Sequence, residues 1–437
     1  MDRTRGWLVL GFLERPEEQW RLTSAHFPSK VGGKPAWLAL DPLPGRSELA
    51  CRRCGKPCVF LLQVYAPLSE KEHCFHRVLF FFICQDTDCY TEHHDSSPFI
   101  VLRSQLPRIN PFYSPDPPVG PTASPVAVMP HLCAVCGSYG PTVCSCCRTR
   151  HYCSREHQVI HWRAGHRGAC SSQGERKDGV DDSDKHSFLF QEFEIITEGE
   201  DEQEGDDEDT DEEEEDDELA EEIVTPGAKS FNAGEDVQDL EAMFRNESKE
   251  DQSFRIFERL VAIAPKQVIR YGHGAAPLWV SNSHVPSSHD IPPCSCGAQR
   301  AFEFQIMPQL LNDLNVDKLG ASIDWGTLAV YTCSQSCRPA TDGETRTYSY
   351  LPEFVWKQDF VQNNKITEEL GHIASRTRVR GQPKYVIVLL HYKDCRQYNH
   401  QHYAIVAWDP GIMRCAQMRM PNNPKGSFYL CLYDHFY

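Results

Sequence analysis

Residues 133–170 read CAVCGSYGPTVCSCCRTRHYCSREHQVIHWRAGHRGAC, and this stretch determines the fold of the region around it. Eight of its cysteine and histidine side chains form four closely spaced pairs. Two pairs have the C-x-x-C spacing, and two have a spacing of four residues, which places both side chains on one face of a helix. The eight candidate metal ligands are Cys133, Cys136, Cys144, Cys147, Cys153, His157, His166 and Cys170.

This set of ligands predicts two structural zinc sites. Zinc prefers four thiolate or imidazole donors at tetrahedral corners, so eight donors make two closed sites without an open position for catalysis. The segment has few large apolar residues, and metal binding worth about 10–16 kcal/mol would hold it together. Spacing alone does not decide whether the pairs combine sequentially or in an interleaved way. We expect His151 and His161 to be packing or surface groups, and Cys146 to be either a spare or a competing ligand.

The order of these ligands resembles a MYND finger, in which Tyr152-Cys153-Ser154 and His161-Trp162 precede the last two ligands. The resemblance implies that the first and third pairs share one ion. It also implies that the second and fourth pairs share the other.

Two further groups of cysteines lie on either side of the finger. In each group a short cysteine pair precedes one apolar strand, and a second pair follows another, as in a zinc ribbon. Cys58 and Cys74 lie inside or between the strands and are weaker candidates. The candidate ligands are Cys51, Cys54, Cys84 and Cys89 in the first ribbon and Cys294, Cys296, Cys333 and Cys337 in the second.

The second ribbon repeats the first. When the two are aligned on Cys54 and Cys296, glycine follows at once, an aromatic residue stands six positions on, glutamine nine and a β-branched residue ten. Leucine also lies five positions before the third ligand in both. The simplest explanation of this match is an internal repeat. The alternative is that two unrelated zinc ribbons share these features. The matching pairs are Gly55/Gly297, Phe60/Phe302, Gln63/Gln305, Val64/Ile306 and Leu79/Leu328.

These features predict a zinc-rich α+β fold with two antiparallel zinc-ribbon-like β lobes packed together. We expect an N-terminal ribbon lobe at 1–110, a proline-rich linker at 111–132, the finger at 133–170, a disordered acidic linker at 171–230 and a C-terminal ribbon lobe at 231–360. Residues 361–437 form an extension of unknown structure. A hairpin extension and a poorly folding alternative transcript are both open readings of it.

The charge of the chain is concentrated in one segment. The net charge is −18, yet 19 residues between Glu198 and Glu222 are acidic and none is Lys or Arg, so the rest of the chain is nearly neutral. Such a block stays solvated and unfolded. It is either a solubilising linker or a segment that attracts a basic client over a long range.

The cysteine content indicates a reducing compartment. Twenty cysteines without a convincing export signal favour zinc ligands over disulfides. The apolar run Trp7–Leu13 is cut off by Glu14-Arg15-Pro16 without a cleavage site, and no stretch approaches the roughly 20 apolar residues of a membrane helix. We therefore expect a soluble intracellular protein without a membrane partner.

Several stretches outside the finger carry a second resemblance. They are FLLQVYAP (60–67), FQEFEI (190–195), QVIRYG (267–272), MPQLLN (307–312) and IDWG (323–326). Together with the finger they resemble the programmed cell death protein 2 family from near the start to about residue 360. The resemblance implies a chaperone or adaptor that holds one newly made small-subunit ribosomal protein for small-subunit assembly. It also implies a location in cytoplasm and nucleus and a link to cell proliferation and stem-cell maintenance.

Two other classes of function compete with this expectation. MYND fingers of transcription corepressors bind proline-containing peptides, which would make the chain a nuclear adaptor that binds other proteins. Binding of DNA or RNA through the finger's arginines is less favoured than a solvated basic face. MYND fingers also occur in lysine methyltransferases, but the chain has no glycine-rich cofactor motif, G-x-S-x-G or H-E-x-x-H. We expect no enzymatic activity.

Overall fold

The computed structural model describes residues 8–122, 130–170, 188–199, 249–314, 316, 322–338 and 350–360, and four short strands between residues 385 and 429. Two compact units are present, residues 1–361 and 362–437. Most of the acidic run, from residue 200 onward, lies outside the described residues, as do Cys395, Cys415 and Cys431. In the described residues no helix is both long and apolar enough to cross a membrane.

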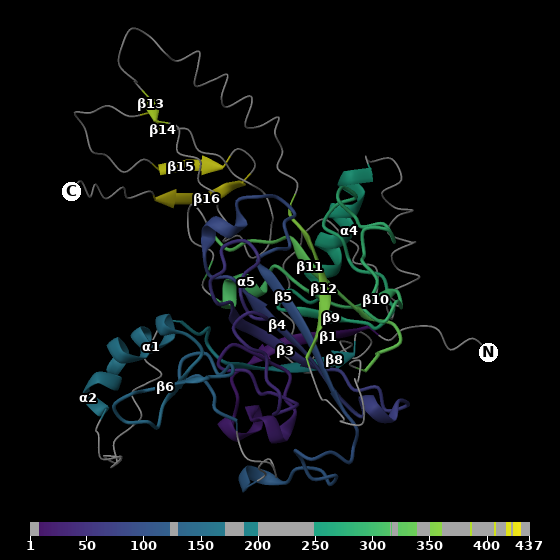
Figure 1. Cartoon of the computed structure of the whole chain (residues 1–437). Coiled ribbons are helices and arrows are strands. Elements are labelled where there is room, and N and C mark those ends of the chain that lie inside the picture. Colours follow the sequence, from purple (N-terminus) through teal and green to yellow (C-terminus); the bar gives the residue numbers. More distant parts are fainter. Residues whose placement is uncertain are drawn as a thin grey trace, which may run out of the picture. The chain divides into compact units, whose positions relative to one another are not determined.

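The first unit is built around a closed antiparallel barrel of ten strands (Figure 1). Neighbouring strands follow the order β1-β8-β2-β3-β4-β5-β12-β11-β10-β9, and β9 pairs with β1 to close the ring. The strands are β1 (Val9–Glu14), β2 (Lys30–Val31), β3 (Val59–Tyr65), β4 (His76–Ile83), β5 (Phe99–Leu106), β8 (Phe193–Gly199), β9 (Ile269–Tyr271), β10 (Arg300–Ile306), β11 (Thr327–Cys333) and β12 (Leu351–Gln358).

This arrangement corrects the expectation of two separate ribbon lobes. The N-terminal hairpin β3-β4 and the C-terminal hairpin β10-β11 are parts of one sheet, because β5 pairs with β12 between them. On the other side β1 pairs with both β8 and β9. The two halves therefore share one hydrogen-bonded ring and one interior.

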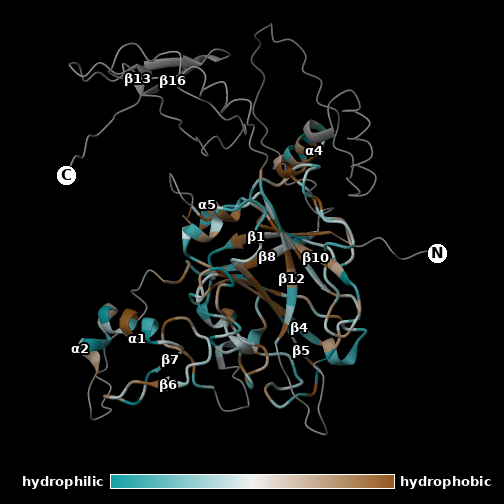
Figure 2. Ribbon diagram, turned by 45° about the horizontal axis from the view of Figure 1, so that its top comes forward, coloured by the Kyte–Doolittle hydropathy of each residue, from teal (hydrophilic) through white to brown (hydrophobic). Residues whose placement is uncertain are grey.

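The barrel strands are apolar because both of their faces are covered. Along β4, Leu79, Phe81 and Ile83 point into the barrel interior, whereas Phe80 and Phe82 pack against an outer layer that contains Trp37. Successive side chains of a strand point to opposite faces, so burial on both faces gives a continuous apolar run. Figure 2 shows brown hydrophobic residues along several strands of the barrel.

The hydrogen-bonding register of the two hairpins is the same. Phe60 opposes Phe82, and the matching Phe302 opposes Tyr331, each two positions before the third cysteine. A β-bulge follows at the same place in both, where Leu61 and Glu303 are the extra residues. The glutamines also match, since Gln63 opposes Phe80 and Gln305 opposes Ala329. This agreement supports the internal repeat.

Short elements complete the first unit. The longest is helix α4, which packs Phe257 and Leu260 into small apolar clusters. The remaining elements are η1 (Gln19–Leu22), η2 (Ser24–His26), η3 (Glu72–Cys74), η4 (Thr87–Tyr90), η5 (Gly120–Thr122), β6 (Thr142–Val143), β7 (His151–Tyr152), α1 (Arg155–His161), η6 (Trp162–His166), α2 (Arg167–Ala169), α4 (Lys249–Ile263) and α5 (Leu310–Asp313).

The second unit contains two small antiparallel sheets. Strand β13 (Tyr385–Val386) pairs with β14 (Val406–Ala407), and β15 (Gln417–Met420) pairs with β16 (Asn423–Tyr429). Most of residues 361–437 lie outside the described residues, so the two readings of this extension stay open.

Candidate metal centres

Four groups of cysteine and histidine side chains come together in the described residues, each with its ligand atoms within 4.8 Å of one another. They are Cys51, Cys54, Cys84 and Cys89; Cys133, Cys136, Cys153 and His157; Cys144, Cys147, His166 and Cys170; and Cys294, Cys296, Cys333 and Cys337. All sixteen residues singled out from the sequence lie in these groups, four to each.

The N-terminal ribbon group lies where β4 ends. The Sγ–Sγ distances are 3.6 Å between Cys54 and Cys84 and 3.8 Å between Cys51 and Cys89. Gly55 has a φ of +71°, and its N–H donates to the Cys51 carbonyl, which closes the turn that carries the first pair. The Asp86 N–H donates to the Cys84 sulfur at 3.4 Å, so the backbone of the loop favours a thiolate there.

The C-terminal ribbon group has the same construction. The Sγ–Sγ distances are 3.5 Å between Cys294 and Cys337 and 3.6 Å between Cys296 and Cys333. Gly297 has a φ of +86°, and its N–H closes the turn on the Cys294 carbonyl. Burial raises the pKa of the Cys294 thiol, but hydrogen bonds from the Cys296 N–H and neighbouring thiols bring it to about 7.

The two finger groups are interleaved. Cys136 lies 3.6 Å from Cys153, and the sulfur of Cys153 lies 3.1 Å from Nδ1 of His157, so the first and third pairs share one centre. The sulfur of Cys144 lies 3.8 Å from that of Cys170 and 3.5 Å from Nε2 of His166, so the second and fourth share the other. This is the pairing that the MYND resemblance implies.

Local structure positions the finger ligands. The Ser154 hydroxyl caps helix α1 by accepting from the His157 N–H at 3.2 Å. His166 lies at the end of η6, and the ring of His161 stacks on it with centroids 4.7 Å apart. Tyr152 bonds Nδ1 of His161 at 2.8 Å. His161 is therefore a packing group that holds a ligand in place, as expected from the sequence.

The geometry of all four groups fits zinc. A tetrahedral site with Zn–S bonds of about 2.3 Å has edges of about 3.8 Å, close to the thiol separations above. Although burial lowers it, the pKa of His157 rises to about 9 because the Cys133 and Cys153 sulfurs bond the ring. Such crowding of thiols and imidazole is relieved by a divalent cation. Zinc bound there would be four-coordinate and structural.

Other cysteines lie outside these groups. Cys58 is buried, and burial raises the pKa of its thiol well above the usual value. Cys74 is also buried and has a raised pKa for the same reason. Cys146 is exposed beside Cys147 and belongs to none of the four groups. Cys58 and Cys74 behave as small core residues.

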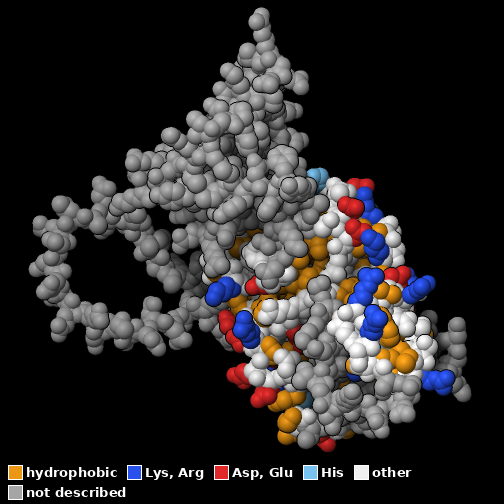
Figure 3. All heavy atoms as spheres, turned by 90° about the vertical axis from the view of Figure 1, so that its left-hand side faces the viewer, with side chains coloured by type: hydrophobic (Ala, Val, Ile, Leu, Met, Phe, Trp, Pro, Cys, Tyr) orange, Lys and Arg blue, Asp and Glu red, His pale blue; other side chains and the backbone are white. Residues whose placement is uncertain are grey.

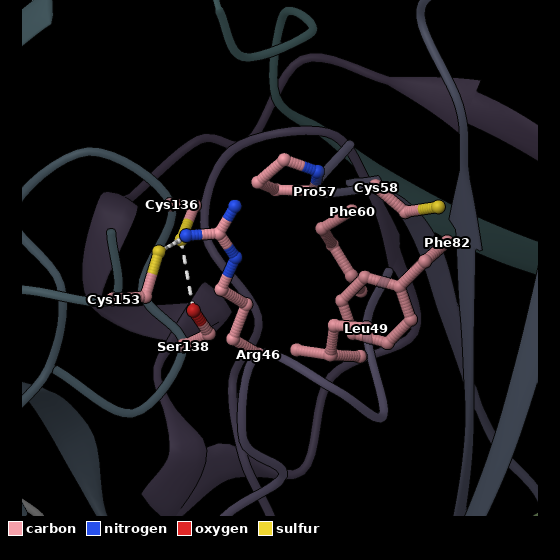
Figure 4. A pocket seen from close by; sticks show the side chains of 9 residues that line it. All are labelled: Arg46, Leu49, Pro57, Cys58, Phe60, Phe82, Cys136, Ser138 and Cys153. Carbon is pink, nitrogen blue, oxygen red and sulfur yellow. Dashed lines mark hydrogen bonds between the residues drawn. The ribbon is translucent and has the colours of Figure 1, made fainter. Parts of the chain in front are cut away.

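The finger contacts the N-terminal half of the barrel. Trp37 Nε1 donates to the Gly137 carbonyl at 2.7 Å, and a Cβ on Gly137 would lie 2.8 Å from Lys34. Only glycine fits this close approach. In Figure 4 the Arg46 side chain extends toward Cys136 and Cys153 on one side of a small cavity, and Phe60 and Phe82 line the other side. Arg46 pairs with Glu156 of the finger at 3.5 Å.

The surface of the finger is basic and partly apolar. Trp162 and Val159 are each 38% exposed, and Glu156 is the one acidic residue between positions 131 and 170. Figure 3 shows Lys and Arg side chains beside exposed hydrophobic ones on one face of the molecule. The exposed arginines of the finger are Arg148, Arg155, Arg163 and Arg167.

Buried ion pairs join the two halves of the barrel. Arg77 of β4 donates twice to the Glu303 carboxylate of β10, at 2.7 Å each, and both side chains are fully buried. Burial raises the pKa of Glu303, but Arg77 more than reverses this and holds it well below the usual range. Arg103 of β5 pairs with Glu353 of β12 and donates to the Cys337 carbonyl at 3.0 Å. The N-terminal half thereby holds a ligand loop of the C-terminal half.

The two halves also share a second motif that the sequence analysis did not identify. Gln63 accepts from the Ala36 N–H and donates to the Ala36 carbonyl, and Gln305 makes the same two bonds with Leu278. Ala36 and Leu278 stand between proline and tryptophan in both halves. The missed signal is this Pro-x-Trp motif, which lies the same number of residues before each glutamine.

Comparison with known proteins gives three matches to family models. They are the programmed cell death protein 2 N-terminal domain over residues 8–120, the MYND finger over residues 133–170, and the programmed cell death protein 2 C-terminal putative domain over residues 251–359.

Curated relatives cover most of the chain. Programmed cell death protein 2 of Rattus norvegicus is 46% identical over 360 residues, which span 81% of this chain and 96% of the relative. That of Bos taurus is 47% identical over 366 residues, 82% of this chain and 98% of the relative. Probable 20S rRNA accumulation protein 4 of Schizosaccharomyces pombe is 27% identical over 129 residues, 27% of this chain and 32% of the relative. No solved structure matches the chain.

Proposed function

The chain belongs to the programmed cell death protein 2 family, and on that premise we propose that it is a zinc-braced holder of a newly made small-subunit ribosomal protein. It would keep that client soluble and support assembly of the small ribosomal subunit. The observation that carries the proposal is the similarity to a Schizosaccharomyces pombe relative whose name concerns the accumulation of a ribosomal RNA. The family is not a known enzyme family, and we propose a non-catalytic role for this member.

The construction of the molecule supports a holding role. Two ligand groups and the buried ion pairs between the halves would brace the barrel, and two further groups would brace the finger. A rigid surface loses little entropy when a partner binds. Ribosomal proteins have basic segments that bind RNA, and those segments need a negative partner before assembly. The acidic run from Glu198 to Glu222 supplies that charge.

The experiment that tests this proposal is purification of the tagged full-length chain from cells, followed by quantitative mass spectrometry. We expect one small-subunit ribosomal protein in near-equal amount with the chain. A matched variant with Glu198–Glu222 replaced by a neutral Gly-Ser segment of equal length should release that protein faster and show weaker dependence on salt. Recovery of no ribosomal protein would overturn the proposal.

The proposed holding role also predicts the cellular location of the chain. A client made in the cytoplasm and assembled with ribosomal RNA requires the holder in both cytoplasm and nucleus. Imaging of the tagged chain should find it in both compartments, and confinement to one of them would contradict this part of the proposal.

The exposed Trp162 and Val159 favour a second candidate, an adaptor that binds proline-containing peptides through its finger in transcription corepression. Recovery of several chromatin proteins in place of a ribosomal protein would support it. In that case Trp162→Ala should abolish their recovery while leaving the zinc content unchanged.

A further inference from the structure

Strand β8 has a free edge beyond its contact with β2. The two strands pair at Glu194 with Lys30 and at Phe193 with Val31, and the Ile195 N–H donates to the Ser29 carbonyl at 2.9 Å. Phe27 then adopts a left-handed backbone with a φ of 49°, which turns the chain away from β8. Among the described residues, the rest of β8 pairs with β1 alone.

The backbone of Thr197 faces this free edge. In an antiparallel strand, alternate residues direct both their N–H and their C=O to the same side. Ile195 directs its N–H toward β2, and Thr197, two positions later, faces the same way. Thr197 is exposed, and β2 has already turned away where a partner would lie. One donor and one acceptor are therefore open to an added strand.

A hollow of about 410 Å³ lies beside this edge. It is lined by Ile195 and Thr197 of β8 and by the aromatic rings of Trp20, Phe27 and Tyr65. Phe27 stacks against both Tyr65 and His76, with ring centroids 5.8 and 4.1 Å away, and those two rings are themselves 6.2 Å apart. Because neighbouring rings hold these side chains, the hollow is formed before any ligand arrives.

The charge balance around the hollow is negative. Glu194 and Arg21 both line it and pair with each other at 3.0 Å, so they offset one another. The 85% exposed Glu17 lies 3.6 Å from the same arginine and adds a negative charge. Glu18 is also exposed. Carboxylates next to aromatic faces bind guanidinium and ammonium groups. In the sequence, β8 leads directly into the acidic run. A nucleic acid backbone would be repelled.

We propose that the free edge of β8 and this hollow bind an extended, arginine- or lysine-rich segment of the client, which adds to the sheet as a strand. Main-chain bonds to Thr197 supply affinity, and alternate side chains of the segment enter the hollow. This inference rests on the proposed holding function and adds the surface at which the client is held.

The test uses the full chain and a fluorescein-labelled peptide of about ten residues that alternates Arg and Thr, a typical strand length. Thr197→Pro removes the N–H that faces the hollow and leaves the bonds of β8 to β1 intact, because those come from the neighbouring residues. The matched control Thr197→Val keeps that N–H. We expect Thr197→Pro to weaken binding about tenfold or more and Thr197→Val to change it less than about twofold.

A further variant and a second peptide measure how much charge contributes to binding of the peptide. Glu194→Gln should weaken binding of the Arg-Thr peptide about fivefold, and a peptide that alternates Glu and Thr should not bind to the wild-type chain. An unchanged zinc content and melting temperature establish that each variant is folded. Equal affinities of Thr197→Pro and Thr197→Val, or binding of the Glu-Thr peptide, would overturn the proposal. So would binding that requires removal of residues 2–7, because the chain's own Arg3 and Arg5 would then be the occupant.

Capture of the small-subunit ribosomal protein is measured with the same variants. Wild-type capture that Thr197→Pro loses and Thr197→Val keeps would support the site. Wild-type capture that Thr197→Pro retains would overturn the docking site and leave the proposed function standing. A wild-type chain that captures no ribosomal protein would overturn the proposed function itself.

Discussion

The N-terminal and C-terminal halves of the barrel share a backbone plan but differ in two places. The register, the bulge, the glutamine bonds and the four-cysteine group match. At the bulge, however, the N-terminal half has the core residue Leu61 where the C-terminal half has Glu303. On the outer face, Trp37 is 1% exposed, whereas its counterpart Trp279 is only half-buried.

The features that both halves keep are those that the fold requires, and the features that differ are those that one half adds. Backbone register is fixed by the metal loops and the glutamine bonds, which both halves keep. The side chain at the bulge is free to vary, and in the C-terminal half it carries the ion pair that joins the halves. The outer face is free to vary too, and in the N-terminal half it holds the finger.

The largest expected effect comes from breaking one metal group in each half. Cys84→Ser and Cys333→Ser should each lower the zinc content by one equivalent and unfold the barrel that both halves share, since structural zinc contributes about 10–16 kcal/mol against a total stability of about 5–15 kcal/mol. Elemental analysis and circular dichroism measure both. The exposed, unliganded Cys146→Ser is the matched control. Full zinc content in either variant would argue against its ligand group.

Next in size is the loss of the ion pair that distinguishes the halves. Arg77→Met should destabilise the chain by about 3–5 kcal/mol because it leaves Glu303 buried without its charge partner. Denaturant unfolding measures this. The double variant Arg77→Met with Glu303→Leu gives the C-terminal bulge the residue of its counterpart and should regain part of the loss. If the double variant is no more stable than the single one, the charge explanation is wrong.

Low pH should also weaken the ion pair between Arg77 and Glu303, but by less than the Arg77→Met substitution does. The pKa of Glu303 in the folded chain lies below its usual value of 4.5. Its contribution is therefore present above about pH 4.5 and is lost as the pH falls further. Hydrogen bonds from Tyr271 and Thr332 to Glu303 remain when it is protonated, so the loss is smaller than in Arg77→Met. Unfolding between pH 6 and 3 should be less steep in pH for Glu303→Gln than for the wild type.

The glutamine bonds test whether the halves are equivalent. Gln63→Ala and Gln305→Ala should each cost about 1–3 kcal/mol, because a buried backbone N–H and carbonyl lose their partner. The two costs should be similar, since Gln63 also donates to the Pro28 carbonyl and Gln305 also donates to the Thr327 hydroxyl. Denaturant unfolding of the two variants gives the comparison directly. A neutral effect at one position and a large one at the other would break the equivalence.

The smallest effect concerns the contact between the finger and the N-terminal half of the barrel. Arg46→Ala removes the pair with Glu156, in which both side chains are about half exposed. It should cost at most about 1 kcal/mol and leave the zinc content at four equivalents. Protease sensitivity of the finger should rise slightly. Release of zinc would mean that Arg46 supports the Cys136 centre more than this pair suggests.

Much of this architecture could be predicted from the sequence because metal ligands and apolar strands leave local signals. The strands at Val59–Tyr65 and His76–Ile83 and the grouping of cysteines around them follow from residue spacing. The closure of the two ribbons into one barrel does not, because pairing of β5 with β12 leaves no pattern in either strand alone. No local pattern marks Glu303 as half of a buried ion pair, because its partner Arg77 is 226 positions away and the bulge that places it there is visible only in the structure.

The ring is completed by β1, which pairs with β9 although the two strands are about 260 positions apart. During translation β1 therefore emerges long before its partner, and the ring cannot close until β12, which ends at Gln358, has also left the ribosome. Folding that depends on such distant pairings is slow. A chain truncated before β9 would leave one side of β1 as an open apolar edge, which favours aggregation.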